Sequence, residues 1–232
     1  MQERFSLDRS LLTEAGHLLG ERPNVSWLLG GSCTGKSMVA GLIQANTDIS
    51  VIDMDGLIFG GFMAAYQPER HPAATYWFGA ANPLDRALSL SWEAFDSLNR
   101  ASNAEFLDLL SKLLARRAKT EALLIEGGFT HPSVLTQVVP ASTIVCLQAS
   151  DQIRFECWET AEERADMKRW INDLEDGEAK WRKFLYFDKM IAETLVAESQ
   201  LAGITIIERR EASSGEAMAK SVQLALGLRS SG

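Results

Sequence analysis

A glycine-rich segment near the N-terminus has residue types and spacing suited to binding phosphate. Residues 30–37 read GGSCTGKS, which fits the pattern G-x-x-x-x-G-K-[ST]. Because glycine reaches main-chain angles closed to other residues, the N–H groups of such a loop can turn toward phosphate oxygens. Lys36 would reach the β- and γ-phosphates of a nucleoside triphosphate, and the Ser37 hydroxyl would hold Mg²⁺. The candidate nucleotide-binding residues are Gly30, Gly31, Ser32, Cys33, Thr34, Gly35, Lys36, Ser37 and Met38.

Two aspartates, Asp53 and Asp55, follow a short β-branched segment at residues 49–52. If that strand continued, both side chains would point to the same face and could reach one cleft. One carboxylate could then assist Mg²⁺, and the other could accept the proton of a substrate hydroxyl. In the alternative, Asp53 caps the following helix and Asp55 is solvated in a turn.

A third acid, Glu126, follows an unbroken apolar run at residues 122–125. Since a carboxylate left in a core is costly, we expect Glu126 at the rim of the sheet. It could bind Mg²⁺ through water, act as the base in place of Asp55, or form a salt bridge with Lys36 or an arginine. The sequence leaves open which of the three acids is the base.

The segment at 156–178 is charged and helical, and it contains Arg164, Lys168 and Arg169. On a helix Arg164 and Lys168 share one face. A guanidinium from this segment could neutralise charge in the transition state of a phosphoryl transfer, and Arg154 is a further candidate. In the alternative the segment is a solvated helix whose cations pair with the surrounding acids.

Apolar periodicity predicts the elements that must position these residues. The expected strands cover residues 25–29, 49–52, 122–125, 143–147 and 204–207. The expected helices cover residues 7–19, 36–45, 102–117 and 216–226, with a charged helical stretch over 151–200 that breaks near 176–177. For the helix at 102–117, Ser102 and Glu105 form a capping box.

Strands that alternate with helices in this way give a parallel, doubly wound sheet. Ligands bind such a sheet beyond the carboxyl ends of its strands. The phosphate-binding loop and the three acids are therefore expected to meet at one edge.

Composition restricts the class of protein further. The chain has 232 residues, of which 46% are hydrophobic, and this is enough for one α/β domain. A formal net charge of −8 argues against a general binder of nucleic acid or of anionic membranes. The first residues do not read as a signal peptide, and no apolar run approaches the roughly 18 residues of a membrane-spanning helix. The oligomeric state cannot be predicted from these features.

The three cysteines, Cys33, Cys146 and Cys157, have neither metal-ligand spacing nor a paired pattern. We therefore expect free thiols and a reducing, cytoplasmic location. Cys33 lies near an expected helix N-terminus, where a thiol could oxidise readily, and the alternative is a small residue that simply fits the loop.

With these motifs, the chain resembles the P-loop small-molecule kinases, a group that includes shikimate kinase, gluconate kinase and the nucleoside monophosphate kinases. Residues 53–55, DMD, look like the D-x-D of shikimate kinases, whose first Asp helps to bind Mg²⁺ and whose second contacts the acceptor hydroxyl. Residues 125–127, IEG, are similar to a strand ending in uridine kinases and 2-phosphoglycerate kinase-like proteins. The chain lacks the glycine triplet of shikimate kinases, and its segment 57–120 is longer than theirs.

The resemblance implies an α/β fold of the P-loop NTPase type, with three layers and a five-stranded parallel sheet that carries helices on both faces. The single domain would have a core (22–56, 120–155, 179–232), a helical substrate-binding insertion (57–119) and a lid (156–178). The implied activity is transfer of the γ-phosphate of ATP to a hydroxyl or phosphate of a small metabolite, with ATP and Mg²⁺ as cofactors. The implied site residues are Lys36, Asp55, Glu126, Arg164 and Arg169 for catalysis, Ser37 and Asp53 for the metal, and Arg210, within a loop 209–212 where this group holds adenine.

Several alternatives stay open at this level. The loop could serve a nucleotide-hydrolysing or nucleotide-sensing regulator that acts through a protein partner, although the chain has no N-K-x-D signature. The acceptor could be a neutral hydroxylated metabolite, an antibiotic or a phosphorylated sugar acid. The aromatic residues of the insertion could line an acceptor pocket or form the insertion's own core; they include Phe59, Phe62, Tyr66, Trp77 and Phe78. Residues 209–212 could be a plain loop.

Overall fold

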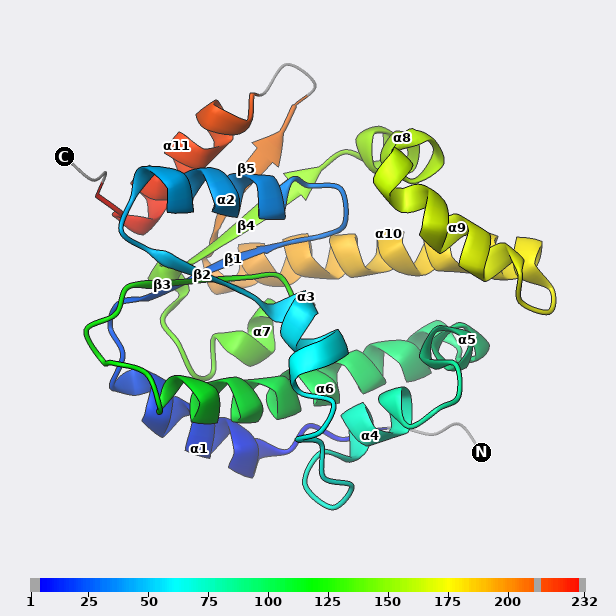
Figure 1. Cartoon of the computed structure of the whole chain (residues 1–232), viewed down its shortest axis with the longest axis horizontal. Coiled ribbons are helices and arrows are strands. Elements are labelled where there is room, and N and C mark those ends of the chain that lie inside the picture. The colour runs from blue at the N-terminus through cyan, green and yellow to red at the C-terminus, as the bar shows by residue number, and fades with distance from the viewer. Residues whose placement is uncertain (1–4, 211–213, 230–232) are drawn as a thin grey trace.

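A five-stranded parallel sheet in the order β2-β3-β1-β4-β5 forms the centre of the protein (Figure 1). The computed structural model describes residues 5–210 and 214–229. The strands are β1 (Val25–Gly30), β2 (Ser50–Asp53), β3 (Leu123–Glu126), β4 (Ile144–Ala149) and β5 (Thr205–Arg209). Every neighbouring pair is parallel, which confirms the predicted fold class.

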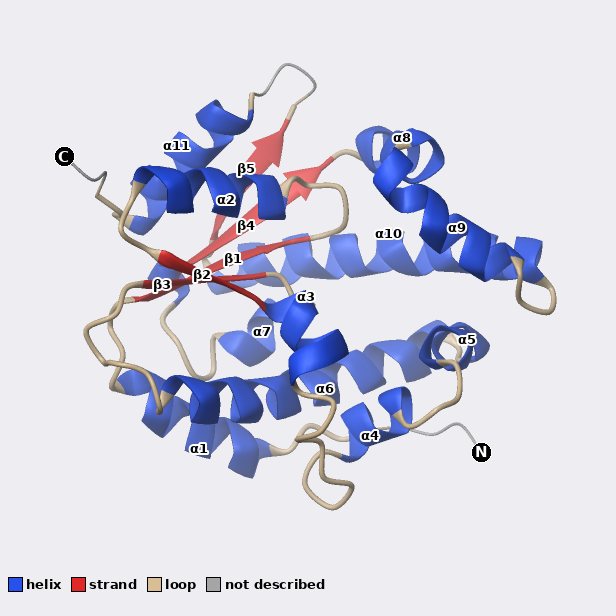
Figure 2. Cartoon of the chain, viewed as in Figure 1, coloured by secondary structure: helices blue, strands red, loops and turns tan. Residues whose placement is uncertain are grey.

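Helices cover both faces of the sheet (Figure 2). One face carries α2 (Lys36–Asn46) and α11 (Gly215–Leu226). The other carries α1 (Arg9–Gly20), α6 (Trp92–Leu114), α7 (Pro132–Leu135) and α10 (Gly177–Ala202). Within residues 5–210 and 214–229, no helix combines the length and the apolar character needed to cross a membrane.

Shorter helices connect these layers. After β2 the chain forms α3 (Met54–Gly56), η1 (Leu57–Gly61), α4 (Pro72–Phe78) and α5 (Pro83–Ser89), and η2 (Ala141–Thr143) precedes β4. After β4 it forms α8 (Asp151–Thr160), η3 (Glu162–Arg164) and α9 (Ala165–Asn172). The gap between α9 and α10 confirms the break predicted near residues 176–177. The division into core, insertion and lid stays a prediction.

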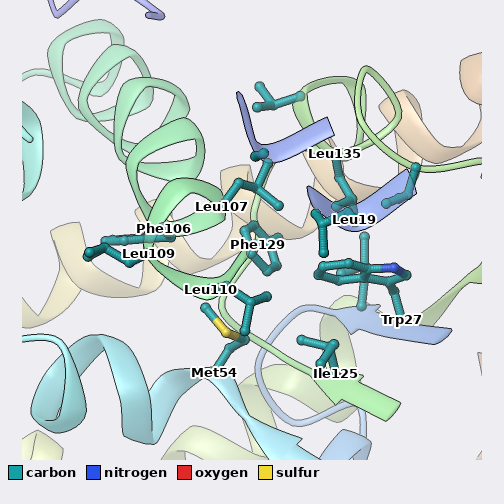
Figure 3. Close-up of a cluster of buried hydrophobic side chains, with 14 of the residues drawn as sticks. Leu19, Trp27, Met54, Phe106, Leu107, Leu109, Leu110, Ile125, Phe129 and Leu135 are labelled. Atoms are coloured by element: carbon teal, nitrogen blue, oxygen red, sulfur yellow. The ribbon is translucent and has the colours of Figure 1, made fainter. Parts of the chain in front are cut away.

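Alternate residues of each central strand bury themselves on opposite faces of the sheet, as strand geometry requires. Trp27 and Leu29 pack toward α1 and α6, whereas Leu28 packs toward α2 and α11. Figure 3 shows Trp27 beside Phe129 on the α6 side, with ring centroids 5.5 Å apart. Each such side chain, fully buried, stabilises the fold by about 1.5–3 kcal/mol. Burial on both faces explains why these strands read as continuous apolar runs.

The parallel register brings the carboxyl ends of β1, β2 and β3 to one edge. Glu126 pairs with Leu28 on one side and with Asp53 on the other. The phosphate-binding loop leaves β1 two residues beyond Leu28. The fold therefore places the loop and the acidic residues at the same edge, as the sequence predicts.

The predicted start of a helix at Ser102 is wrong. Residues 92–114 form one continuous helix, α6, whose N-cap is Ser91. The carboxylate of Glu105 accepts hydrogen bonds from the main-chain N–H groups of Ala73, at 2.9 Å, and Ala74, at 2.7 Å, and so caps α4 instead. Burial raises the pKa of Glu105 to about 7, against the effect of these two donors. A capping-box pattern also fits a helix interior, and the actual partner lies about 30 residues away, beyond the reach of a local pattern.

Candidate functional site

The loop at residues 30–37 joins β1 to α2 with main-chain angles that require glycine. Gly30 has φ +150°, and a Cβ there would lie 2.6 Å from the carbonyl oxygen of Leu147. Gly35 has φ +85° and directly precedes α2. Because α2 begins at Lys36, the positive end of its dipole and its unpaired N–H groups lie at the loop. The segment therefore has the form of an anion-binding loop.

Side chains of the loop hold its conformation from within. The hydroxyl of Thr34 donates to the carbonyl oxygen of Gly31 at 2.8 Å, and Thr34 is fully buried. Lys36 Nζ donates to the same carbonyl at 3.2 Å. The ammonium group thus lies folded over the loop, where a phosphate oxygen would replace the carbonyl as its partner.

Ser37 and Glu126 form the closest contact between the loop and the acidic residues. The Ser37 hydroxyl donates to Glu126 Oε1 at 2.6 Å. Glu126 is only 4% exposed, and its second oxygen, Oε2, is buried without a partner among the described residues. Burial raises the pKa of Glu126, and the Ser37 hydrogen bond and the charge of Lys36 oppose that shift. Glu126 therefore lies at the end of β3, as expected, but its carboxylate is buried there, and the described residues show no salt bridge to it.

These two residues fit a magnesium site. Ser37 Oγ and the unpartnered Glu126 Oε2 supply hard oxygen atoms, which Mg²⁺ prefers. In the part of the chain that the structure describes, no cluster of three or more His, Cys, Asp or Glu residues could hold a metal by itself. Mg²⁺ commonly takes one or two protein ligands and completes its shell with water and substrate phosphate. The donor set thus suits a metal that arrives with a nucleotide.

The two aspartates do not share a strand face, because β2 ends at Asp53. Asp53 accepts a hydrogen bond from the main-chain N–H of Gly56 at 3.1 Å and caps α3, which is the alternative stated above. Asp55 lies inside α3 and accepts from the main-chain N–H of Gly128 at 3.1 Å. The Asp55 side chain is partly exposed, but protein atoms crowd its carboxylate and remove much of its hydration. This desolvation raises the pKa of Asp55, and the charge of Lys36 opposes the shift. Asp55 is therefore the aspartate placed toward a cavity.

Among the described residues, the phosphate-binding loop borders two large cavities and a smaller one of about 200 Å³. The first, here called the apolar cavity, has a volume of about 710 Å³ and is lined in part by Gly31, Ser32, Lys36, Asp55, Phe95 and Arg164. The second, the loop cavity, has a volume of about 510 Å³ and is lined in part by Gly35, Lys36, Ser37, Met38, Arg164 and Arg209. Among the described residues, only Lys36 and Arg164 line both. The two cavities therefore adjoin at two cations.

The structure brings Arg164 to the site and leaves Arg169 away from it. The guanidinium of Arg164 lies over the ring of Trp158, 4.9 Å from its centroid, and its Nε is buried without a partner within residues 5–210 and 214–229. Arg169 is paired with Asp166 on the exposed face of α9 and lines neither cavity. Periodicity alone could not separate the two, since η3 interrupts the helical segment between α8 and α9 and changes which side chains point inward.

The other candidate cations of this region have structural partners. Lys168 pairs with Glu159 and lies over the ring of Trp181. Arg154 is 4% exposed and donates to Asp188 Oδ2 at 2.9 Å. These pairs join α8 to α9 and α8 to α10, and neither cation lines the apolar cavity or the loop cavity described above.

Within the loop 209–212 that is predicted to hold adenine, the sequence analysis selects Arg210, whereas the structure places Arg209, the last residue of β5, at the site. Arg209 lines the loop cavity and donates to the carbonyl oxygen of Cys33, whereas Arg210 is exposed and lies 3.5 Å from Glu208. Arg209 has the same strand parity as Ile207, which packs on the α2 side, and this signal could have selected it. Two residues of the loop predicted to hold adenine, Glu211 and Ala212, lie outside the described residues.

The prediction of three free thiols is wrong for Cys33 and Cys157, which form a disulfide. Their Cα atoms are 6.2 Å apart, and the bond joins the phosphate-binding loop to α8. Cys146 is free and buried in β4. The expectation of a reducing, cytoplasmic location rested on unpaired cysteines, and the structure removes that support. The pairing was missed because the two residues lie 124 positions apart.

Opening this disulfide is expected to lower the free energy of unfolding by about 2–5 kcal/mol, because the bond restricts a long loop of the unfolded chain. Denaturant unfolding with and without a thiol reductant measures the difference. Cys157→Ser should show the lower stability both with and without reductant. The unaltered protein, denatured without reductant, should contain one titratable thiol, that of Cys146. Three titratable thiols, with a stability that reductant does not change, would contradict the cross-link.

Comparison with known proteins adds little to this site. No protein-family model matches the sequence, and no curated protein matches it. Among solved structures, the chain is similar to a shikimate kinase from Acinetobacter baumannii in complex with shikimate, at 16% sequence identity. The match covers 91% of this chain and 97% of that chain, with a TM-score of 0.46. The sheet order and the glycine-rich loop themselves define an α/β fold of the P-loop NTPase type.

Proposed function

We propose that the protein is an ATP-dependent kinase that transfers the γ-phosphate to a hydroxyl group of a small molecule. One observation carries the proposal: two cavities of ligand size adjoin at Lys36 and Arg164. Phosphoryl transfer needs a donor and an acceptor on either side of one phosphate, with positive charge beside it. The loop cavity supports the assignment of the nucleotide, and the apolar cavity that of the acceptor.

In the proposed reaction the hydroxyl oxygen of the acceptor attacks the γ-phosphorus. A new P–O bond forms while the bond from phosphorus to the bridging oxygen of the β-phosphate breaks, and ADP leaves. Asp55 is the proposed base, because its carboxylate lines the apolar cavity and can accept the hydroxyl proton. Lys36 and Arg164 would neutralise the negative charge that spreads over the transferred group.

The remaining residues of the site have binding roles in this proposal. Main-chain N–H groups of residues 31–37 would bind phosphate oxygens, and Arg209 borders the space left for the nucleoside. Ser37 and Glu126 would hold Mg²⁺, which supplies further positive charge to the phosphates. Glu126 is assigned to the metal rather than to proton transfer, because it contacts Ser37 and does not line the apolar cavity.

A coupled assay for ADP tests this function. We expect ADP to form from Mg·ATP only when a hydroxyl compound is added, with phosphate appearing on that compound by mass spectrometry. Candidate acceptors can be found by thermal shift, since a ligand at about 100 times its dissociation constant stabilises the folded state by about 2.7 kcal/mol. ATP hydrolysis that no small molecule stimulates, but that a protein partner does, would instead support the regulatory alternative.

A further inference from the structure

Aromatic rings form much of the wall of the apolar cavity. They belong to Phe59, Trp77, Phe95, Trp158, Trp170 and Phe187. The rings of Phe95 and Phe187 stack with centroids 4.6 Å apart and so connect α6 with α10. Such walls favour flat apolar ligands, which offset-stacked and edge-to-face contacts hold in place.

Few of the described residues that line this cavity are charged. Of its described lining residues, the charged ones are Lys36, Asp55, Arg164 and Asp188. Lys36 and Arg164 lie at the border with the loop cavity, and the Asp188 carboxylate is neutralised by Arg154 at 2.9 Å. Lys183 Nζ lies 5.4 Å from the centroid of the Phe187 ring, but Lys183 does not line the cavity. An acceptor with a carboxylate or phosphate group far from its reacting hydroxyl would therefore find no unpaired cation among the described lining residues there, and burial of an unpaired charge is costly.

The size of the cavity and the exposure of its rings are consistent with this chemistry. A volume of about 710 Å³ falls within the range of about 300–1,000 Å³ typical of sites for drug-sized ligands. Phe59 is 61% exposed and Trp170 is 58% exposed, although both line the cavity. An apolar ligand would cover part of these rings, and removal of apolar surface from water favours binding.

We propose that the phosphate acceptor is an uncharged, mainly apolar molecule that contains an aromatic or other flat ring system and carries the reacting hydroxyl at one end. This inference rests on the proposed kinase function. The ring system lies against the aromatic wall, and the hydroxyl lies at Asp55, next to Lys36 and Arg164. A carboxylate or phosphate elsewhere on the acceptor is selected against.

A matched pair of probes tests the acceptor class: naphthalene-methanol, which is neutral, and the hydroxymethyl-naphthoic acid that differs by one ring carboxylate. Calorimetric titration is done with the full chain in the presence of Mg²⁺ and a non-hydrolysable ATP analogue. We expect the neutral alcohol to bind at least about 100-fold more tightly than the acid, with the negative heat-capacity change of apolar burial. With Mg·ATP, the alcohol should also be phosphorylated.

Exposed aromatic residues provide matched variants. Phe59→Ser and Trp170→Ser should each weaken binding of naphthalene-methanol by about 10-fold, since each removes part of an aromatic wall. Phe155→Ser and Tyr186→Ser are the controls, because these rings are 56% and 49% exposed and line neither cavity. We expect the controls to bind the alcohol as the unaltered protein does, and all four variants to bind Mg·ATP normally.

The outcomes separate this inference from the proposed function. Equal or tighter binding of the acid, no difference between wall and control variants, or no binding of either probe at about 1 mM would overturn the acceptor class. In those cases normal Mg·ATP binding would leave the kinase assignment standing. Failure of the unaltered protein to bind Mg·ATP would overturn both the kinase assignment and the acceptor class.

Discussion

Replacing Asp55 by Asn is expected to lower kcat by about 100- to 10,000-fold, the range typical of a lost general base. Asn keeps the size of the side chain and an oxygen that can accept from the Gly128 N–H. The KM for ATP should change little, because Asp55 belongs to the apolar cavity rather than to the loop cavity. Steady-state kinetics with a phosphorylated hydroxyl compound measure both quantities.

The pH dependence of the same reaction gives an independent measurement. Desolvation raises the pKa of Asp55, so the carboxylate becomes protonated at a higher pH than that of an ordinary aspartate. Only the deprotonated form can accept the hydroxyl proton, and kcat should therefore fall as the pH drops through this raised pKa. In Asp55→Asn this fall in kcat at low pH, the acid limb of the pH–rate profile, should disappear.

Two variants of neighbouring acids serve as comparisons for Asp55→Asn. Asp53→Asn keeps the cap of α3, because Asn is as good an N-cap as Asp, and should reduce kcat far less. Glu126→Gln keeps an acceptor for Ser37 and should mainly raise the Mg²⁺ concentration needed for half-maximal rate. If Glu126→Gln instead removed the acid limb while Asp55→Asn left it, the base would be Glu126.

The second large effect is expected for Lys36→Met, which keeps most of the apolar stem and removes the charge. We expect kcat/KM for ATP to fall by about 100- to 1,000-fold, as when one preorganised donor to a transition-state anion is lost. Lys36 lines both cavities, so both nucleotide affinity and the transfer step should suffer.

The control for Lys36→Met is Lys220→Met, an exposed lysine on α11. It should have the kinetics of the unaltered protein. Turnover by Lys36→Met at the unaltered rate would show that the loop does not bind the reacting phosphates.

Features with local causes could be predicted from the sequence. The strands follow from apolar runs that are buried on both faces, and β1 and β3 agree with prediction to within one residue at each end. The phosphate-binding loop depends on glycines at fixed positions within eight residues. The meeting of Lys36, Ser37, Asp55 and Glu126 follows from the rule that parallel strands end at one edge.

Features that depend on distant partners could not be predicted. Whether Asp53 or Asp55 faces a cavity depends on where β2 ends. The strand ends at Asp53, which is the N-cap of α3. Glu105 caps a helix about 30 residues earlier in the chain, and Cys33 pairs with a residue 124 positions away. Among the aromatic residues of segment 57–119, Phe59 and Trp77 line the apolar cavity, and Trp77 also contacts the core, whereas Phe62, Tyr66 and Phe78 join or contact the core without lining that cavity. That division reflects packing between helices, which no local pattern records.

The most direct measurement of the central claim is a crystal structure of the protein with Mg²⁺ and a non-hydrolysable ATP analogue. The account predicts the β- and γ-phosphates within the loop at residues 30–37, in contact with Lys36, and Mg²⁺ about 2.0–2.1 Å from Ser37 Oγ. The γ-phosphate should face Asp55 across the boundary of the two cavities. A nucleotide bound elsewhere, or a loop left empty at a saturating concentration of the analogue, would contradict the claim.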